Sequence, residues 1–313
     1  SAFASGNKII NGGGKTIALS SAIAFNNVSN LTVRDLIIDV TSTSGSNFIT
    51  FSGTQDAAKT ITQDALANQS TICCDSTGLA KGDLIFIQSN QIFEIATNTF
   101  VSQYARVLSV ASGSITTDTD LLYDFKVADA AKLSKVTTAK NIRFENVTFI
   151  GADTGTKNAL MFDKCEDCYV DVNISKIDYA GVVFAQSINC KATGTYKNAH
   201  GAGLSYGVAI TNGCHNVRVV NAYGEDLRHL VSVGGTKGVN NFCGAYLNHG
   251  RNCRDAVIDS HPASNYFIVI GNTAECTGQA STPKDGFISQ GLNTIFEDNT
   301  VIGALTTSLT IES

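Results

Sequence analysis

The chain has 313 residues, of which 43% are hydrophobic and 16% are charged, with 28 Gly, 2 Pro and no Trp. This composition is sufficient for one large elongated domain and is typical of short strands joined by polar turns. The formal net charge of -5 argues against nucleic acid and anionic membrane surfaces as partners, and no apolar run is long enough to insert into a membrane.

An asparagine that precedes an alternating strand recurs along the chain. The steps from Asn189 onward are 27, 25, 24 and 28 residues, and each step contains two strand-like halves. Segments this short cannot bury their apolar side chains alone, but stacking them about 4.8 Å apart pairs their backbones and aligns equivalent residues. The sequence therefore predicts an all-β fold, a right-handed parallel β-helix (solenoid) with an asparagine turn ladder. The ladder positions are Asn30, Asn141, Asn189, Asn216, Asn241, Asn265 and Asn293, with Cys168 in the one coil that lacks the asparagine.

Three parts follow one another along the chain. Residues 1–53 are expected to form the first β-helix coils, and residues 138–313 the main β-helix. Between them, residues 54–137 carry short alternating segments such as 82–87 and 104–110, with turns at 81–83 and 111–113. We expect a small β-rich insertion domain there, which would either grip a substrate or stabilise the shaft and contact neighbouring chains.

The nine cysteines are an odd number without a paired zinc spacing. Cys165 and Cys168 have the only metal-like separation, and one such pair cannot complete a tetrahedral site. Buried free thiols are therefore expected, in a protein that folds in a reducing cytoplasm. Because Ser1 opens the chain and residues 308–313 still have the pattern of a strand, we also expect a fragment of a longer polypeptide.

When the second strands of successive coils are aligned by their apolar residues, the residues at the start of those strands form two columns of mostly polar side chains. The aligned segments are 207–210, 230–233, 256–259 and 286–289. Any one such residue is typical of a solvated turn, but the columns concentrate acids, bases and cations in a chain with few charges. The columns are Tyr206, His229, Asp255 and Asp285, and beside them Ser205, Arg228, Arg254 and Lys284.

Further carboxylates lie near these columns. Asp259 aligns with Val233 and Ile210, which are expected to face inward, so we interpret it as a buried carboxylate that orients His261 or as a structural turn residue. Glu225 precedes Arg228 and offers a second carboxylate, with an exposed acidic turn as the alternative.

The chain resembles the bacteriophage tailspike depolymerases of the pectate-lyase-like right-handed β-helix superfamily. The resemblance rests on the Asn-led coils, the insertion with segment 82–87, and segments 226–229 and 254–261. It implies a homotrimer in the virion tail, synthesised in the host cytoplasm, that binds a bacterial surface polysaccharide such as capsule, exopolysaccharide or O-antigen for host recognition. The run of closely spaced Asp residues that pectate lyases use for calcium is absent, so no metal and no other cofactor is predicted.

The resemblance further implies cleavage of the polysaccharide, and two chemistries fit. In a lyase, the preferred hypothesis, His229 or Tyr206 would be base and acid, Arg228 or Arg254 would neutralise a uronic carboxylate, and Asp255 would orient its neighbours. A glycoside hydrolase would use Asp255 with Asp285 or Glu225. A non-catalytic receptor-binding adhesin is the alternative from another class. The residues expected to bind substrate are Glu225, Asp259, His261, Lys284 and Asp285.

Overall fold

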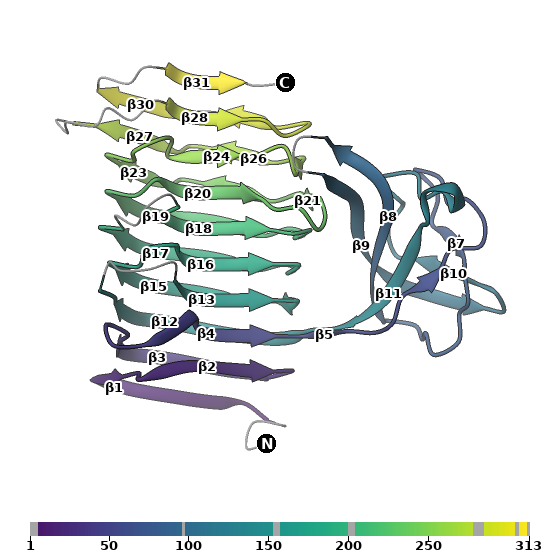
Figure 1. The fold of residues 1–313 in the computed structure, drawn as a ribbon, viewed down its shortest axis with the longest axis horizontal. Coiled ribbons are helices and arrows are strands. Elements are labelled where there is room, and N and C mark those ends of the chain that lie inside the picture. Colours follow the sequence, from purple (N-terminus) through teal and green to yellow (C-terminus); the bar gives the residue numbers. More distant parts are fainter. Residues whose placement is uncertain are drawn as a thin grey trace.

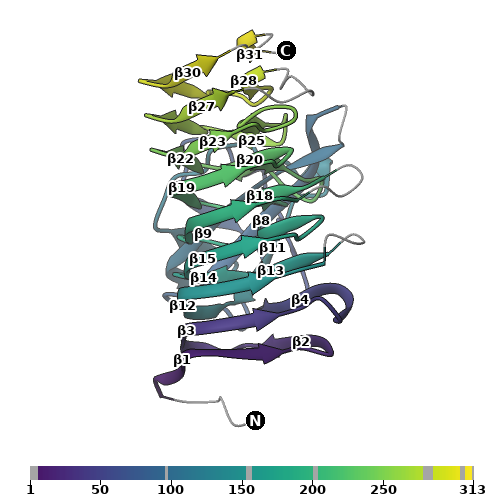
Figure 2. The ribbon, with the colours of Figure 1, turned by 90° about the vertical axis from the view of Figure 1, so that its left-hand side faces the viewer.

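The computed structural model describes residues 6–95, 98–152, 157–199, 204–277, 285–303 and 307–311. It confirms the predicted right-handed parallel β-helix with a β-rich insertion (Figure 1). Viewed from the side, the coils stack in chain order from the N-terminus to the C-terminus (Figure 2). Among the described residues, no helix has the length and apolar character needed to cross a lipid bilayer.

A nine-stranded parallel sheet forms one long face of the stack, and its strands follow one another in chain order. Inward-facing phenylalanines explain its register, because Phe51, Phe162 and Phe184 pair across successive strands and their rings stack 5.5 and 5.2 Å apart. The strands are β2 (Ser21–Asn26), β4 (Ser44–Ser52), β13 (Asn158–Asp163), β16 (Ala180–Ala185), β18 (Tyr206–Thr211), β20 (His229–Gly234), β24 (Ile258–Ser260), β28 (Asp285–Ser289) and β31 (Thr307–Ile311).

A thirteen-stranded sheet completes the coils, with a two-stranded sheet of β21 (Asn240–Asn241) and β25 (Ser264–Asn265). The apolar residues of both large sheets meet in one continuous core along the axis. The strands of the thirteen-stranded sheet are β1 (Lys8–Ala18), β3 (Ser29–Asp39), β12 (Ala139–Ile150), β14 (Cys165–Glu166), β15 (Tyr169–Ser175), β17 (Lys191–Lys197), β19 (Arg218–Glu225), β22 (Gly244–Tyr246), β23 (His249–Arg251), β26 (Ile268–Ile270), β27 (Thr273–Cys276), β29 (Ile295–Glu297) and β30 (Thr300–Gly303).

The asparagine ladder exists, but in three coils the left-handed backbone position lies one residue away from the predicted residue. Asn141 donates to Asn30, and Asn216 donates to Asn189, at 2.9 and 2.8 Å. These residues adopt the left-handed backbone conformation that asparagine tolerates. In three other coils the left-handed residue is Asp167, Phe242 or Tyr266, each adjacent to the predicted residue.

The residues predicted at these three positions make other contacts, although Asn265 still accepts a hydrogen bond from Asn293 at 2.9 Å. Cys168 packs inside the coil, as does Cys190 in the next one, and their side chains are 2% and 1% exposed. Asn241 and Asn265 are buried against the insertion, where both bond to the hydroxyl of Tyr123. All nine cysteines are free and all but Cys73 are buried.

The insertion has its own seven-stranded antiparallel sheet and its own apolar core. Figure 1 shows it beside the coils. Buried Glu166 of the shaft pairs with Arg106 of the insertion and, at 3.0 Å, with Lys140. The division into three domains at residues 53/54 and 137/138 stays a prediction. The elements of the insertion are β5 (Thr54–Gln55), β6 (Lys59–Thr60), β7 (Thr71–Cys73), β8 (Leu84–Glu94), β9 (Thr99–Ala111), β10 (Ser114–Thr117), the short 3-10 helix η1 (Val127–Asp129) and β11 (Lys132–Thr137).

Candidate functional site

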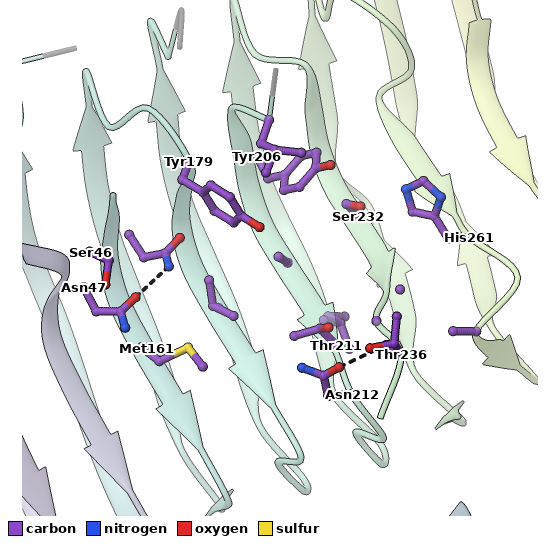
Figure 3. Close-up of a pocket in the computed structure, with 18 residues that line it drawn as sticks. Ser46, Asn47, Met161, Tyr179, Tyr206, Thr211, Asn212, Ser232, Thr236 and His261 are labelled. Carbon is purple, nitrogen blue, oxygen red and sulfur yellow. Dashed lines mark hydrogen bonds between the residues drawn. The ribbon is translucent and has the colours of Figure 1, made fainter. Parts of the chain in front are cut away.

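A groove of about 680 Å³ lies on the outer face of the nine-stranded sheet (Figure 3). Its floor is a row of outward side chains that pair in register from coil to coil, namely Met161, Val183, Ala209 and Ser232. These side chains face outward because their neighbours along each strand point into the core. The floor is therefore apolar at one end and becomes polar towards Ser232.

Two tyrosines form the wall of the groove. The rings of Tyr179 and Tyr206 meet edge to face at 6.3 Å, and Figure 3 shows both beside the floor, with Ser232 between Tyr206 and His261. Aromatic rings that are partly exposed in a groove offer both an apolar face and a hydroxyl to a ligand. Sequence analysis missed Tyr179, although aligning segment 181–182 with segment 207–208 would have revealed a second tyrosine near the start of the strand.

A charged cluster follows Tyr206 in the next coil. Tyr206 pairs with His229, as the predicted column requires, and their rings stack 5.5 Å apart. Arg228 places Nη1 3.4 Å from the hydroxyl of Tyr206 and Nη2 3.2 Å from Oδ2 of Asp255. Burial raises the pKa of Tyr206, while the charge of Arg228 opposes that shift. The arrangement brings a phenol, a guanidinium and a carboxylate together at one edge of the groove.

His229 is the buried centre of this cluster, with a fully covered side chain. Its Nδ1 donates to the carbonyl oxygen of Ala256 at 2.9 Å, so Nε2 faces Asp259 at 3.2 Å and Asp255 at 3.8 Å. Burial lowers the pKa of His229, although both carboxylates act in the opposite direction. Because the ring is covered, His229 is able to position the ring of Tyr206 that stacks on it but cannot touch a polysaccharide.

The predicted register of Asp259 is wrong by one residue. Asp259 pairs with Ser232 and Ile288 on the outer face and not with inward-facing Val233. The carbonyl oxygen of Val257 accepts hydrogen bonds from two consecutive amides, those of residues 230 and 231, which marks an irregularity that the sequence pattern does not reveal. For the same reason the predicted column is wrong after His229, since Ala256 and not Asp255 follows it.

Asp259 nevertheless contacts His261, which one of its two predicted roles requires. Oδ2 of Asp259 lies 3.0 Å from Nε2 of His261, whose ring lines the groove. Burial favours the neutral form of both groups, but the hydrogen bond and the opposite charges outweigh it, so the pKa of Asp259 is lowered and the pKa of His261 is raised. The protonated form of His261 and the ionised form of Asp259 therefore stabilise each other at the edge of the groove.

The remaining predicted residues lie outside these contacts. Arg254 directs Nη2 to the carbonyl oxygen of Ala199 at 3.4 Å. Asp285 is joined to Asp255 by a backbone hydrogen bond, and its Oδ1 accepts one from Thr310. Lys284 lies outside the described residues.

Glu225 belongs to a different surface. It ends β19 in the thirteen-stranded sheet, where it pairs with Lys197 at 3.0 Å and with Arg251 at 3.5 Å. These cations lower its pKa. The structure therefore does not bring Glu225 together with Asp255, and this carboxylate pair is withdrawn as a hydrolase hypothesis. Within the described ranges, no group of three or more His, Cys, Asp or Glu residues has the arrangement of a metal site.

Comparison with known proteins shows similarity at the level of fold. No family model and no curated protein matches the sequence. Among solved structures, the tailspike gp49 of Pseudomonas phage LKA1 matches with a TM-score of 0.64 at 15% identity, over 98% of this chain and 69% of that one. The Gp54 tailspike of Acinetobacter baumannii bacteriophage AP22, in complex with A. baumannii capsular saccharide, matches with a TM-score of 0.61 at 16% identity, over 98% and 63%.

A third tailspike has the same fold. It is gp61 of Pseudomonas phage phi297, with a TM-score of 0.62 at 14% identity, over 94% of this chain and 57% of that one. The chain thus spans between 57% and 69% of the lengths of these three tailspikes.

Proposed function

We propose that this chain is the shaft of a homotrimeric phage tailspike, located in the virion tail, that binds a bacterial surface polysaccharide in the groove and cleaves it. The groove carries the proposal, because a long sheet face with two tyrosines, a histidine and an adjoining charged cluster matches what an extended glycan requires. The fold shared with three tailspikes supports it, and the AP22 tailspike was solved with a capsular saccharide.

Cleavage by β-elimination is the favoured chemistry. It needs a base for the proton next to a uronic carboxyl group, a cation for that carboxylate, and an acid for the leaving oxygen. In this proposal Tyr206 is the base in its ionised form, which the charge of Arg228 beside its hydroxyl favours against the effect of burial, and protonated His261 is the acid. Arg228 and Arg254 are the candidate cations, and His229 is a positioning residue because its ring is buried.

Hydrolysis is the second candidate, and one observation favours it. Asp255 and Asp259 both approach Nε2 of His229, at 3.8 and 3.2 Å, so their two Oδ2 atoms are no farther apart than the sum of these distances. That limit allows the separation of about 5 to 5.5 Å of a retaining glycosidase and the shortest separations, about 6.5 Å, of an inverting one. This pair takes the place of the pair of Asp255 and Glu225, and it requires that a sugar reach Asp259, whose side chain is 4% exposed, beside His261.

Incubation with capsules and O-antigens from a panel of host strains tests the proposal. Elimination releases an unsaturated product that absorbs in the ultraviolet, whereas hydrolysis releases reducing ends without that absorbance. Under elimination, Tyr206→Phe lowers the rate by about 10²- to 10⁴-fold and Asp255→Asn lowers it less. Under hydrolysis, Asp255→Asn lowers the cleavage rate more than Tyr206→Phe does.

Tyr169→Phe is the matched control, because Tyr169 lies on β15 in the other sheet. It is expected to cleave at the wild-type rate. Binding without either product would replace the enzyme by an adhesin, and the absence of both binding and cleavage across the panel would refute the proposed function.

A further inference from the structure

A second cleft continues the groove towards the insertion. It has a volume of about 530 Å³ and lies between the shaft and the first strands of the insertion. Thr236 lines both the groove and this cleft, so the two hollows meet at the loop that follows β20. A ligand that leaves the groove past Thr236 therefore enters the cleft.

The cleft is cationic, whereas the groove is nearly neutral. Lys164 and Lys237 line the cleft, and no Asp or Glu is among its described lining residues. Lys164 pairs with Asp163 at 2.8 Å, but Lys237 is exposed and no described residue bonds to its ammonium group. His261 is the one titratable group other than tyrosine among the described residues that line the groove. In a chain with a formal charge of -5, this local concentration of cations favours an anionic group of the ligand.

The loop that carries Lys237 is held rigidly from both sides. The insertion binds it through Gln88, which donates to the carbonyl oxygen of Lys237 at 2.9 Å, and through Thr99, which donates to that of Gly235 at 2.9 Å. The shaft binds it through Oδ1 of Asn212, which accepts from the amides of residues 236 and 237 at 3.1 and 3.3 Å. These bonds fix the backbone from which the Lys237 side chain extends, so less backbone entropy is lost when a ligand arrives.

The backbone of this loop is also constrained. Gly235 has a φ of +106°, and a Cβ atom there would lie 2.3 Å from Oγ1 of Thr211. Only glycine fits that position, so the path of the chain before Lys237 is set by the shaft. The amides of Gln88 and Gln186 and the ring of Phe100 complete the lining with groups that suit a sugar ring.

We infer that the cleft between the insertion and the shaft is a subsite for a carboxylated sugar, with Lys237 as the residue that binds the carboxylate. The inference rests on the proposed function and extends it, since it assigns a binding position for an acidic sugar outside the groove where cleavage is proposed. Neighbouring units of the same glycan lie in the groove, and the acidic unit passes Thr236 to reach Lys237. The insertion then acts in recognition, because it both forms one wall and fixes the loop.

Ligand-observed saturation-transfer NMR on the whole chain tests the subsite. The probes are sodium D-glucuronate, D-galacturonate and N-acetylneuraminate, with D-glucose and inorganic phosphate for comparison. At least one sugar acid is expected to bind while glucose does not, and Lys237→Gln is expected to weaken that binding about tenfold, because a hydrogen bond to a charged group is lost. Lys191→Gln, on β17 of the thirteen-stranded sheet, is the control and leaves binding unchanged.

Three results would overturn the subsite. These are no binding of any of the three sugar acids, equal binding in Lys237→Gln, and displacement of the sugar acid by an equimolar amount of phosphate, which would indicate a general anion site. The two proposals fail separately. Loss of cleavage with retained sugar-acid binding refutes the enzyme alone, and cleavage without sugar-acid binding refutes the subsite alone.

Discussion

Asp259 and His261 shift each other's ionisation in opposite directions. Because the pKa of His261 is raised in the folded protein, protonation of His261 stabilises the fold. This stabilisation is complete at pH values below the ordinary pKa of 6.5 and is lost as the pH rises through the raised pKa. The lowered pKa of Asp259 means that its share is complete above the ordinary value of 3.8 and is lost as the pH falls through the lowered value. The pair therefore stabilises the fold between these limits.

Asp259→Asn tests this pair. Without the carboxylate, burial becomes the dominant effect on His261, so its pKa is expected to fall below 6.5. An NMR titration of the imidazole signals measures the change. Glu275→Gln is the control, since it removes the partner of His249 in the other sheet and leaves His261 untouched. An unchanged pKa of His261 in Asp259→Asn would show that the contact does not govern its ionisation.

Sequence reasoning identified the types of residue in the site better than their contacts. It grouped Tyr206 with His229 and Asp259 with His261, and the structure shows both contacts. It did not predict that His229 is covered, because burial on the outer face depends on side chains from the neighbouring coils. Those coils are separated by turns of variable length, and a single extra residue shifts every later partner.

The positions of most turns and strands could be predicted from the sequence for a physical reason. Left-handed turn positions favour asparagine, so Asn30, Asn141, Asn189 and Asn216 mark the coils in the sequence itself. The pattern fails where tertiary contacts replace the local preference. Phe242 and Tyr266 take the left-handed position, and their rings stack 5.0 Å apart.

Substitutions of Asn216 can separate two contributions to stability at a ladder position, namely the left-handed backbone conformation and the side-chain hydrogen bonding. Asn216→Ala places a side chain that disfavours φ near +53° and removes the bond to Asn189, so the free energy of unfolding is expected to fall by about 2 kcal/mol. Asn216→Gly keeps the backbone conformation and loses only the side-chain hydrogen bonds to Asn189 and from Arg218, so it is expected to cost about 1 kcal/mol. Urea unfolding curves give both values. Equal or reversed effects would show that backbone conformation is not what selects asparagine here.

At the scale of the whole molecule, the insertion and the shaft are joined by buried polar contacts. The hydroxyl of Tyr123 donates to Oδ1 of Asn241 at 2.5 Å and accepts from Nδ2 of Asn265 at 2.7 Å. The sequence predicted a separate β-rich unit at residues 54–137 but gave no sign of this bridge. The bridge joins residues 142 positions apart, and such a distance is beyond any local pattern.

Tyr123→Phe tests how firmly the two parts are coupled. The change leaves two buried amides short of a partner, so the free energy of unfolding is expected to fall by about 1 to 3 kcal/mol. Hydrogen exchange is expected to accelerate in β9, whose Ser102 carbonyl oxygen accepts from the same Asn241. Tyr169→Phe is the control, because no described residue bonds to that hydroxyl. Unaltered exchange in β9 would show that the bridge is dispensable.

The floor of the groove also bears on how such a surface changes over time. Met161, Val183, Ala209 and Ser232 occupy equivalent places on successive coils, yet they differ in size and polarity. Backbone pairing holds each of them, so a codon change at one place leaves the inward residues undisturbed. Each coil can therefore carry a different side chain on the floor, and under the proposed function a substitution there would alter ligand preference without moving the scaffold.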